Sequence, residues 1–439
     1  MYNRRQFIGF GASAFIAASG RVFGVESPSN RVRLAIVGCH ERGRGQQVMK
    51  SAMRVPGVDI ACVCDVDSRA MDWAAGNVFA SSGIAPEKVR DFRKVLEDPS
   101  IDGVILETPD HWHAWGAVMA MRAGKAVYVE KPCAFCPREG EILLETQRRT
   151  GAVLQVGSQR RSSRSYADAV AFLRSGAIGE PKWAKCWFMS NRASIGKGKE
   201  SPVPEWLDWD LWQGPAPRTA FRDNFVHYNW HWFRRWGTAE TGNNMPHYTD
   251  VARWALGVEW PETVQAMSTS AFMKGGDFEW PDVYDVSFKF PGGKLVTFQL
   301  SCHHNACPYM GVASGAMVYC EKGAAFFHPA DTVTIYGGKS RELRTFQSGG
   351  SSAVGSLTNP TDSLDVMHVS NFVECLRAGN AATNAPADVG VKSSFMPLVA
   401  NIAADLGETV RIDPATGAPL TKAAGALWSR EYEKGWELT

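Results

Sequence analysis

After residue 30, short apolar runs alternate with amphipathic stretches over the first third of the chain. The runs cover residues 31–37, 60–64, 103–106, 126–129 and 153–156, and helical patterns such as residues 115–123 lie between them. Uninterrupted apolar runs are typical of strands buried on both faces of a parallel sheet, and the intervening helices cover those faces. The pattern predicts an α/β, doubly wound parallel sheet over residues 31–157, with ligands at the carboxyl ends of its strands.

The rest of the chain, residues 158–439, has a different pattern. Segments rich in β-branched and aromatic residues predict strands at 182–189, 263–272, 283–290 and 294–300, and Pro291-Gly292-Gly293 marks a hairpin turn between the last two. Residues 366–378 and 394–406 have the spacing of amphipathic helices, and Gly379 is a typical stop for the first of them. This half is therefore predicted to mix strands and helices.

Residues 1–30 read as a targeting segment. Arg4 and Arg5 precede Phe7 and Ile8, and an apolar run continues to about Ala18. The run is too short to span a bilayer but fits the apolar core of a signal peptide. The Arg-Arg-x-Phe-Ile pattern resembles a twin-arginine signal, so we expect export to the periplasm. The alternative is a disordered or membrane-tethered tail. No other long apolar run is present, so we expect no stable membrane insertion.

Composition narrows the choice of partners. Lys and Arg number 47 against 45 Asp and Glu, a net charge of +2, which argues against a nucleic-acid binder. Cys133 and Cys136 form a lone Cys-x-x-Cys, and no acids cluster with His303 and His304. We therefore expect no metal, and we interpret the cysteines as small apolar core residues. The 16 tryptophans exceed ordinary usage, and ten of them lie between Trp183 and Trp260.

A glycine-rich turn follows the first apolar run. Gly38 and Gly43 occupy the first and third glycines of a Gly-x-Gly-x-x-Gly pattern, and His40 replaces the second; we place Arg42 in the same cofactor loop. Asp65 ends the second run, where a carboxylate can accept hydrogen bonds from ribose hydroxyls. It would also repel a 2′-phosphate, so NAD is favoured over NADP. Asp67 is the competing acid. The pattern predicts an NAD-binding Rossmann domain.

Further motifs follow the later strands and carry a family resemblance. They read TPDHWHA from Thr108, AGKAVYVEKP ending at Pro132, LQVGSQRR from Leu154, DWDLWQGPAPR over 208–218, the stretch 228–257, and ALWSREYEKGW over 426–436. In this order the chain resembles the glucose–fructose oxidoreductase/inositol dehydrogenase (Gfo/Idh/MocA) family. The resemblance implies a C-terminal α+β domain over residues 158–439 with a large, mostly antiparallel sheet. It also implies a homodimer or homotetramer.

The resemblance also implies the reacting groups. Lys131 follows a buried strand, and partial burial would lower its pKa and let it stabilise an alkoxide or relay a proton. The alternative is a solvated lysine paired with Glu130. His247 matches the catalytic histidine, a candidate general base, although it could also be a structural histidine before Asp250. Many relatives carry Asp where this chain has Asn243, and Glu240 could restore a carboxylate nearby.

Other site residues are carried over by motif position. The cofactor contacts implied are Thr108, Pro109, His113, Glu130 and Lys131, in addition to those of the glycine-rich turn and Asp65. The substrate contacts implied are Arg160, Arg161, Tyr228, Trp230, His231 and His247. Aromatic faces stack on the C–H faces of sugars, and arginines hydrogen-bond hydroxyls or bind carboxylates. For any single tryptophan, core packing is the alternative.

Together these features favour an NAD-dependent oxidoreductase that acts on a carbinol of a sugar, polyol or sugar derivative. One alternative is a glycoside hydrolase that oxidises a ring hydroxyl, eliminates the aglycone, adds water and returns the hydride. A non-catalytic carbohydrate-binding protein is the third possibility. Because an exported enzyme lacks a dependable pool of free NAD, export would favour a tightly bound cofactor and a closed redox cycle.

Overall fold

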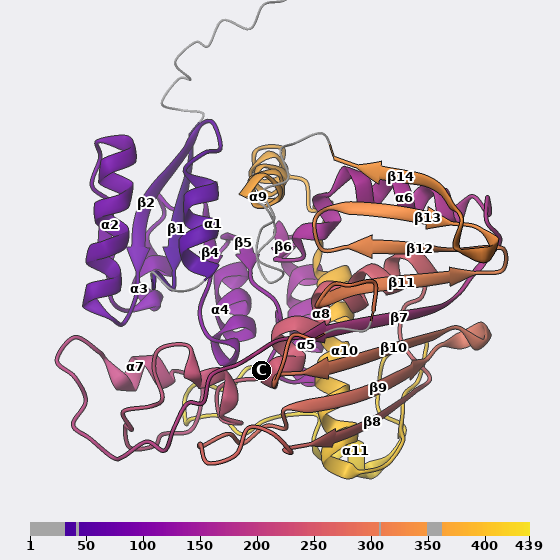
Figure 1. Ribbon diagram of the computed structural model, residues 1–439. Helices are drawn as coiled ribbons and strands as arrows, with labels where there is room; N and C mark the ends of the chain where they lie inside the picture. The colour runs from indigo at the N-terminus through magenta and orange to yellow at the C-terminus, as the bar shows by residue number, and fades with distance from the viewer. Residues whose placement is uncertain (1–30, 41–43, 307–308, 349–361) are drawn as a thin grey trace, which may run out of the picture.

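The computed structural model describes residues 31–40, 44–306, 309–348 and 362–439 (Figure 1). The proposed signal segment and the cofactor-loop residues Arg42 and Gly43 lie outside the described residues. The N-terminal elements are β1 Val32–Val37, α1 Arg44–Ala52, β2 Val58–Cys64, α2 Ser68–Ser82, β3 Glu87–Val89, α3 Phe92–Glu97, β4 Gly103–Leu106, α4 Asp110–Arg122, β5 Ala126–Val129, α5 Pro137–Thr150 and β6 Leu154–Val156.

These strands form one parallel sheet. In the described part of the chain it has six strands in the order β3-β2-β1-β4-β5-β6. Every residue of β4 and β5 is buried, as the uninterrupted apolar runs require. From β1 the strands β2 and β3 follow on one side, and β4, β5 and β6 lie on the other. This switch between β1 and β4 leaves a crevice at the carboxyl ends of the two strands, where open α/β sheets bind their ligands. The predicted doubly wound sheet is confirmed.

The second half builds a larger sheet and its covering helices. The elements are α6 Arg164–Arg174, β7 Pro181–Met189, α7 Trp209–Gln213, α8 Ala239–Leu256, β8 Thr263–Thr269, β9 Val283–Lys289, β10 Leu295–Ser301, β11 Ser314–Cys320, β12 Gly323–His328, β13 Thr332–Tyr336, β14 Glu342–Gln347, α9 Asp362–Arg377, α10 Ala387–Leu406, β15 Val410–Arg411 and α11 Lys422–Ala426. Where the chain is described, the sheet has nine strands in the order β14-β13-β12-β11-β7-β10-β9-β8-β15.

This sheet is mixed but mostly antiparallel, since only the β7–β10 pair among its described pairs is parallel. Along β7, Ala184, Cys186 and Phe188 face the core that α6, α8 and α10 cover. Trp187 and Met189 belong to a separate cluster on the opposite face. The predicted α+β domain with a large, mostly antiparallel sheet is confirmed.

Several predicted bounds differ from the structure. β8 ends at Thr269 rather than at residue 272, and α4 begins at Asp110, directly after Pro109. α10 begins at Ala387, seven residues before the predicted start at 394. Its first two turns carry the polar pair Asp388 and Lys392, which form an ion pair one helical turn apart, whereas residues 393–403 are buried throughout. β11 to β14 were not predicted at all.

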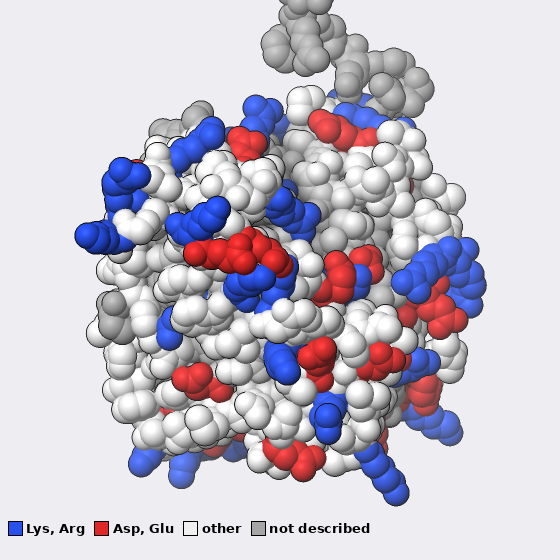
Figure 2. Space-filling view, turned by 90° about the vertical axis from the view of Figure 1, so that its right-hand side faces the viewer, with Lys and Arg blue, Asp and Glu red and all other residues white. Residues whose placement is uncertain are grey.

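The end of the chain returns to the N-terminal domain. Val369, Phe372 and Val373 of α9 pack with β1 and α1, and α10 contacts both α5 and β8. Beyond α11 a C-terminal arm, residues 427–439, runs back to α4, where Trp436 packs on Trp112 and Trp115. Figure 2 shows basic and acidic side chains interspersed over one side of the molecule. No helix among the described residues is long and apolar enough to cross a membrane.

Candidate active site

The turn after β1 brings the chain close to the next strand end. Gly38 has φ +89°, which favours glycine, and an added Cβ would lie 2.7 Å from the backbone carbonyl of Glu107. The backbone N–H of Gly38 donates to Cys64 O at 2.9 Å. No larger residue fits between β1 and the loop after β4, so the glycine that the sequence singled out has a steric cause.

Asp65 lies at the end of β2, facing this turn. Its carboxylate accepts hydrogen bonds from the backbone N–H of Cys39 at 2.6 Å and of Asp67 at 2.9 Å. Burial raises the pKa of Asp65 above its ordinary value, while these two hydrogen bonds oppose the rise. Asp65 therefore shapes the glycine turn as well as lining the cleft in front of it.

A cleft of about 920 Å³ opens at the carboxyl ends of the parallel strands. Its lining contains most of the predicted cofactor residues, namely Gly38, His40, Asp65, Thr108, Pro109, His113, Glu130 and Lys131. Pockets for small molecules and cofactors usually span about 300–1,000 Å³, so the volume suits a cofactor together with a small substrate. From the second half, Leu211, Trp212, residues 227–230 and Asn243 also line the cleft.

The loop after β4 lies on the floor of the cleft. His113 bridges this loop to the one after β5, because its ring nitrogens lie 2.7 Å from the backbone oxygens of Thr108 and Pro132. Pro109 precedes the first residue of α4. Among the described residues, Thr108 Oγ1 is a buried hydroxyl that has no hydrogen-bond partner. A buried polar atom that faces a cleft is an available contact for a polar ligand.

Lys131 lies where β5 opens into the cleft. Its backbone N–H donates to Glu130 Oε2 at 3.2 Å, and Gln159 Nε2 donates to Glu130 Oε1 at 2.7 Å. The Lys131 ammonium instead points to α8, where it donates to the backbone O of Asn243 at 2.9 Å and lies 3.4 Å from Asn243 Oδ1. Glu130 thus fixes the loop and leaves the ammonium directed at the second domain.

His247 lies one helical turn beyond Asn243 on α8. It is 8 % exposed and lines a small pocket next to the cleft, together with Lys131, Arg160 and Asp250. Lys131 lines both cavities, so it lies between the cleft and His247. The structure therefore brings Lys131, Asn243 and His247 together from two domains.

Glu240 lies one turn before Asn243 but faces away from the cleft. It is fully buried and accepts a hydrogen bond from Arg192 Nη2 at 2.5 Å. Burial favours the neutral acid, but the charge of Arg192, its hydrogen bond and the nearby His231 ring lower the pKa of Glu240 to about 2. At neutral pH it is an ion-paired carboxylate behind the site, and such a weak base does not accept a proton readily.

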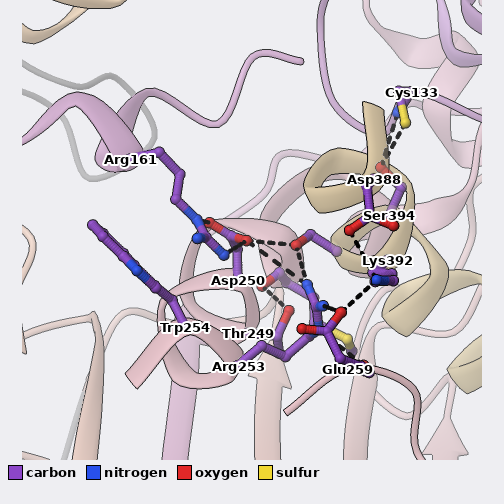
Figure 3. Close-up of polar contacts among 12 residues, drawn as sticks. Cys133, Arg161, Thr249, Asp250, Arg253, Trp254, Glu259, Asp388, Lys392 and Ser394 are labelled. Carbon is purple, nitrogen blue, oxygen red and sulfur yellow. Dashed lines mark hydrogen bonds and ion pairs between the residues drawn. The ribbon is translucent and has the colours of Figure 1, made fainter. Parts of the chain in front are cut away.

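The two predicted arginines have different surroundings. Arg160 is buried, donates to Tyr248 Oη at 3.1 Å and lines the small pocket beside His247. Arg161 forms two hydrogen bonds to Asp250, at 2.7 and 2.8 Å, and contributes to neither cavity (Figure 3). Asp250 also accepts from Ser393 and lies next to Arg253, so Arg161 belongs to a buried network below His247.

Of the three predicted aromatic contacts, two face the cleft. Tyr228 is 45 % exposed and lines it, as does the half-buried Trp230. His231 is buried and does not line the cleft; its Nδ1 donates to the backbone O of Tyr228 at 2.5 Å, and its Nε2 lies 3.6 Å from Glu240 Oε2. Burial raises the pKa of Tyr228 to about 12, so its phenol is protonated at neutral pH.

A segment of the second domain covers the cofactor end of the cleft. We name residues 206–230 the closing segment. The backbone N–H of Ser68 donates to Trp206 O at 2.9 Å, and that of Asp208 donates to Val66 O at 3.0 Å. His227 Nε2 lies 2.9 Å from Asp67 Oδ2. Behind these contacts, aromatic side chains of the segment pack with Phe233 and Trp236; they are Trp209, Trp212, Phe221 and Phe225.

His227 was not among the site residues predicted from the sequence, and Asp67 was predicted only as a competitor of Asp65. The signal for His227 was its position next to Tyr228. The rings of His40 and His227 lie 4.1 Å apart, and with Asp67 they form a group of three potential metal ligands. Asp67 already makes hydrogen bonds to Arg69 through both carboxylate oxygens. The expectation of no metal stays a prediction.

The residues present suit a dinucleotide. Gly38 lets a ligand approach the backbone at the strand end, and the buried Thr108 hydroxyl is available to a polar group at the same floor. Asp65 supplies a carboxylate at the end of β2. A parallel sheet of this strand order, joined to a second domain that contributes residues 211–212, 227–230 and 243 to its cleft, defines a two-domain nucleotide-binding protein.

Comparisons with known proteins identify the protein family. Residues 32–158 match the model described as "Oxidoreductase family, NAD-binding Rossmann fold", and residues 217–326 match "GFO/IDH/MocA C-terminal domain". The chain belongs to the Gfo/Idh/MocA family, and NAD is the cofactor of its N-terminal domain.

Curated relatives match mainly in part. Scyllo-inositol 2-dehydrogenase (NAD(+)) of Bacillus subtilis is 34 % identical over 156 residues, 36 % of this chain and 44 % of that protein. A "Glycosyl hydrolase family 109 protein" of Stenotrophomonas maltophilia is 32 % identical over 187 residues, 40 % of each chain. The chain therefore spans less than half the length of these relatives.

Solved structures match over nearly the whole fold. Levoglucosan dehydrogenase in complex with NADH and levoglucosan has a TM-score of 0.65 at 17 % identity, covering 87 % of this chain and 99 % of that one. Aldose-aldose oxidoreductase from Caulobacter crescentus, complexed with glycerol, has a TM-score of 0.65 at 18 % identity over 87 % and 100 % of the two chains. At such identities the likeness establishes the fold.

Proposed function

We propose that the protein is an NAD-dependent oxidoreductase that acts on a carbinol of a sugar, polyol or sugar derivative. The observation that carries the proposal is the convergence of Lys131 and His247 on one small pocket beside a cofactor-sized cleft. Relatives named as inositol dehydrogenases support the substrate class. Tyr228 and Trp230 offer aromatic faces at the same end of the cleft, as sugar-binding sites do.

The residues around the small pocket have separate roles in the proposed oxidation. Bound NAD supplies the hydride acceptor for the carbinol carbon. His247 accepts the hydroxyl proton, and the Lys131 ammonium stabilises the negative charge that develops on the oxygen. Asn243 holds the ammonium, and Arg160 adds a second donor on the His247 side. Two protein groups thus receive the proton and the charge of one hydroxyl.

The test is oxidation of defined polyols. Scyllo-inositol, myo-inositol and levoglucosan are each offered with NAD, and absorbance of NADH is followed. We expect NADH formation with at least one of them, and a loss of about a hundredfold or more in Lys131→Ala and His247→Ala, as for removal of a general base. If both variants keep full activity, the assigned groups are wrong.

A second candidate is hydrolysis of a glycoside through transient oxidation, which the family 109 relatives favour. The discriminating experiment offers aryl glycosides without added NAD. Release of aryl alcohol without net NADH identifies the hydrolase, whereas stoichiometric NADH identifies the dehydrogenase. If neither appears while sugars still bind, the protein is a non-catalytic carbohydrate-binding protein.

We also propose that the cofactor is tightly held. The closing segment supports this, because the His227–Asp67 and Trp206–Ser68 contacts join the second domain to the turn after β2, next to the Asp65 that lines the cleft. Purified protein should keep its NAD through dialysis, measured by chromatography of an acid extract. A cofactor-free preparation would contradict the proposal.

Export and assembly are further proposals. Arg4 and Arg5 in the twin-arginine pattern support export to the periplasm, which fractionation of cells carrying Arg4→Lys, Arg5→Lys would test. A homodimer or homotetramer is proposed from the family resemblance alone, since the apolar cluster around Trp187 and Phe326 is buried within one chain. Sedimentation equilibrium distinguishes these assemblies from a monomer.

A further inference from the structure

The amide that contacts Lys131 has a buried carboxylate directly behind it. Asn243 Nδ2 donates to Glu240 Oε1 at 3.3 Å, while Asn243 Oδ1 lies 3.4 Å from Lys131 Nζ. The three groups therefore form a chain that runs from a buried anion, through a neutral amide, to an ammonium at the edge of the cleft. Each contact in the chain joins a donor to an acceptor.

The Glu240 carboxylate determines the orientation of the Asn243 amide. If the amide of Asn243 were reversed, its oxygen would lie against the Glu240 carboxylate and its NH₂ against the Lys131 ammonium. Both contacts would then be repulsive, and inside a protein such contacts are poorly screened. Only the observed orientation satisfies both neighbours. Glu240 thus acts on Lys131 although the two side chains do not touch.

The carboxylate is itself held in place from several sides. Arg192 follows β7 and donates to Glu240 Oε1, and Asn244 Nδ2 donates to the same oxygen. Glu240, Asn243 and Asn244 are three and four residues apart, so they share one face of α8. No part of the Glu240 side chain is exposed, whereas Arg192 is 19 % exposed. The pair is therefore a fixed element of the helix and not a mobile surface contact.

We infer that Glu240, anchored by Arg192, is a positioning residue that turns the Asn243 amide oxygen toward Lys131 and so sets where the ammonium stands. The inference rests on the proposed function only in treating Lys131 as a reacting group. The geometry also explains how an amide can occupy a position at which many relatives have Asp. In this chain the carboxylate lies one helical turn earlier, at Glu240, and the amide of Asn243 links it to the Lys131 ammonium.

Exchanging the two groups gives a specific test. In Glu240→Gln the amide of Asn243 loses the anion that orients it. In Asn243→Asp two carboxylates face each other at the 3.3 Å contact. In the double variant, the carboxylate introduced at position 243 can accept from Lys131 and from the NH₂ of the glutamine introduced at position 240. The carbonyl oxygen of that glutamine still accepts from Arg192. Each donor again meets an acceptor, so the second change should repair what either one damages.

The readout is the reactivity of Lys131 itself, measured on the full chain. Competitive acetylation with acetic anhydride, followed by mass spectrometry across a pH series, reports the reactivity of each lysine separately. We expect Glu240→Gln to raise the acetylation rate of Lys131 at least threefold, because the ammonium loses the oriented side-chain oxygen of Asn243 and keeps only the backbone O as acceptor. The double variant should return the rate to the wild-type value or below. Asn243→Asp alone should lower the free energy of unfolding, and it should do so much less when Glu240→Gln is also present.

The chain offers a matched control. Glu139 is as fully buried as Glu240 and pairs with Arg430 Nη2 at 2.6 Å, but it lies on α5 beneath the C-terminal arm. Glu139→Gln should lower stability and leave Lys131 acetylation unchanged. If it raises the Lys131 rate as much as Glu240→Gln does, general loosening explains the effect and the inference is overturned.

Other outcomes also decide the matter. A Lys131 rate within twofold of wild type in Glu240→Gln overturns the inference, as does simple additivity of the two changes. Should Glu240→Gln fail to fold, Asn243→Ala removes the amide without leaving a charge unpaired, and an unchanged Lys131 rate in that variant is equally decisive.

A turnover assay with scyllo-inositol and NAD separates this inference from the proposed function. Glu240→Gln should then lower kcat more than it changes KM. Absence of wild-type turnover on every polyol would count against the proposed function, while the acetylation result would still decide the role of Glu240.

Discussion

Glu130 lies so close to the backbone of Gly157 that an added Cβ would be 2.4 Å from its Oε1. The glycine after β6 therefore leaves room for the carboxylate that receives the backbone N–H of Lys131 and the amide of Gln159. A residue without a side chain thus sets the position of the lysine loop, because nothing larger fits beside Glu130.

Gly157→Ala should displace Glu130 and with it the Lys131 loop. Overpacking of this kind costs about 1–3 kcal/mol of stability, and we expect turnover to fall at least tenfold. Urea unfolding and the NADH assay measure the two effects. Gly76→Ala is the control, since Gly76 is an exposed position within α2 where a Cβ meets no atom within 4 Å. That change should stabilise the protein by about 0.5–1 kcal/mol. Equal effects of the two variants would contradict the steric explanation.

His111 makes the stability of the protein depend on pH. It is fully buried, lies 3.0 Å from Trp212 O through Nε2, and is close to the charge of Arg430. Burial and that charge lower the pKa of His111 to about 3, against about 6.5 in the unfolded chain. The folded state therefore binds fewer protons between these values, and its stability falls as the pH falls from about 6.5 toward 3.

The comparison with His111→Gln isolates this contribution. Glutamine can donate to Trp212 O but does not titrate. Between pH 7 and pH 5 the free energy of unfolding of the wild type should fall by about 2 kcal/mol more than that of the variant, measured by urea unfolding at both pH values. Parallel pH dependences of the two proteins would show that His111 is not held neutral.

Single residues could be predicted from the sequence where a motif fixes their neighbours. Gly38, Lys131 and Asn243 line the cleft as predicted, because each follows or faces a strand end of the parallel sheet. Arg161 could not be placed, since its partner Asp250 lies 89 residues away on another element. The roles of Glu240 and His231 likewise depend on Arg192, whose position in the sequence gives no hint of the contact.

At the scale of elements, the closing segment connects the second domain to the N-terminal domain at the cleft. Its residues pair with the turn between β2 and α2 by two backbone hydrogen bonds and by the His227–Asp67 contact. The hydrogen bonds from His227 and Arg69 lower the pKa of Asp67 against the opposing effect of burial, so this carboxylate is an anion at neutral pH. A charged hydrogen bond therefore joins the two domains over the cofactor end of the cleft.

His227→Ala should loosen this contact and speed the loss of NAD. A hydrogen bond to a charged group is worth about 1.5–3 kcal/mol, so the release rate should rise about tenfold or more. Release is measured by trapping free NAD with an auxiliary dehydrogenase. His304→Ala, at an exposed position away from the cleft, should leave the rate unchanged. An unchanged rate in His227→Ala would show that the closing segment does not retain the cofactor.

The parallel strands were predictable because burial on both faces makes each one a continuous apolar run. β11 and β12 contain Gly and Ala, which are poor strand formers, so their sequences give a weak strand signal; β13 alternates polar and buried apolar residues but is only five residues long. The first two turns of α10 were missed for a different reason. Asp388 and Lys392 are polar and Gly390 is a poor helix former, so the apolar spacing is interrupted there.

At the scale of the whole molecule, the C-terminal arm, residues 427–439, is joined to α4 and α5 of the N-terminal domain. Arg430 pairs with Glu139 of α5 and donates to the backbone O of His111, and Tyr432 Oη donates to Glu139 at 2.8 Å. Trp436 packs on Trp112 and Trp115 of α4. The arm therefore braces the two helices that flank the lysine loop.

Deleting residues 430–439 should destabilise the protein strongly. The deletion leaves Glu139 buried without its ionic partner, which costs about 3–5 kcal/mol when one partner of a buried pair is removed. Thermal and urea unfolding measure the loss. Adding Glu139→Gln to the deletion should recover part of the loss, because the buried carboxylate without an ionic partner is then absent. A loss below about 1 kcal/mol on deletion would show that the arm is only loosely attached.

The tryptophans packed behind the closing segment lie close enough to the cleft for their fluorescence to report on bound NADH. Trp212 lines the cleft and stacks on Trp209 at a ring separation of 4.9 Å, and Trp112 and Trp230 lie along the same cavity. Indole emission overlaps the absorption of reduced nicotinamide, so excitation energy should pass from these tryptophans to a bound NADH and reappear as nicotinamide fluorescence. Each turnover could then be followed by fluorescence in the unlabelled protein. In a closed redox cycle, the nicotinamide fluorescence of bound NADH would rise and fall without any release of free NADH.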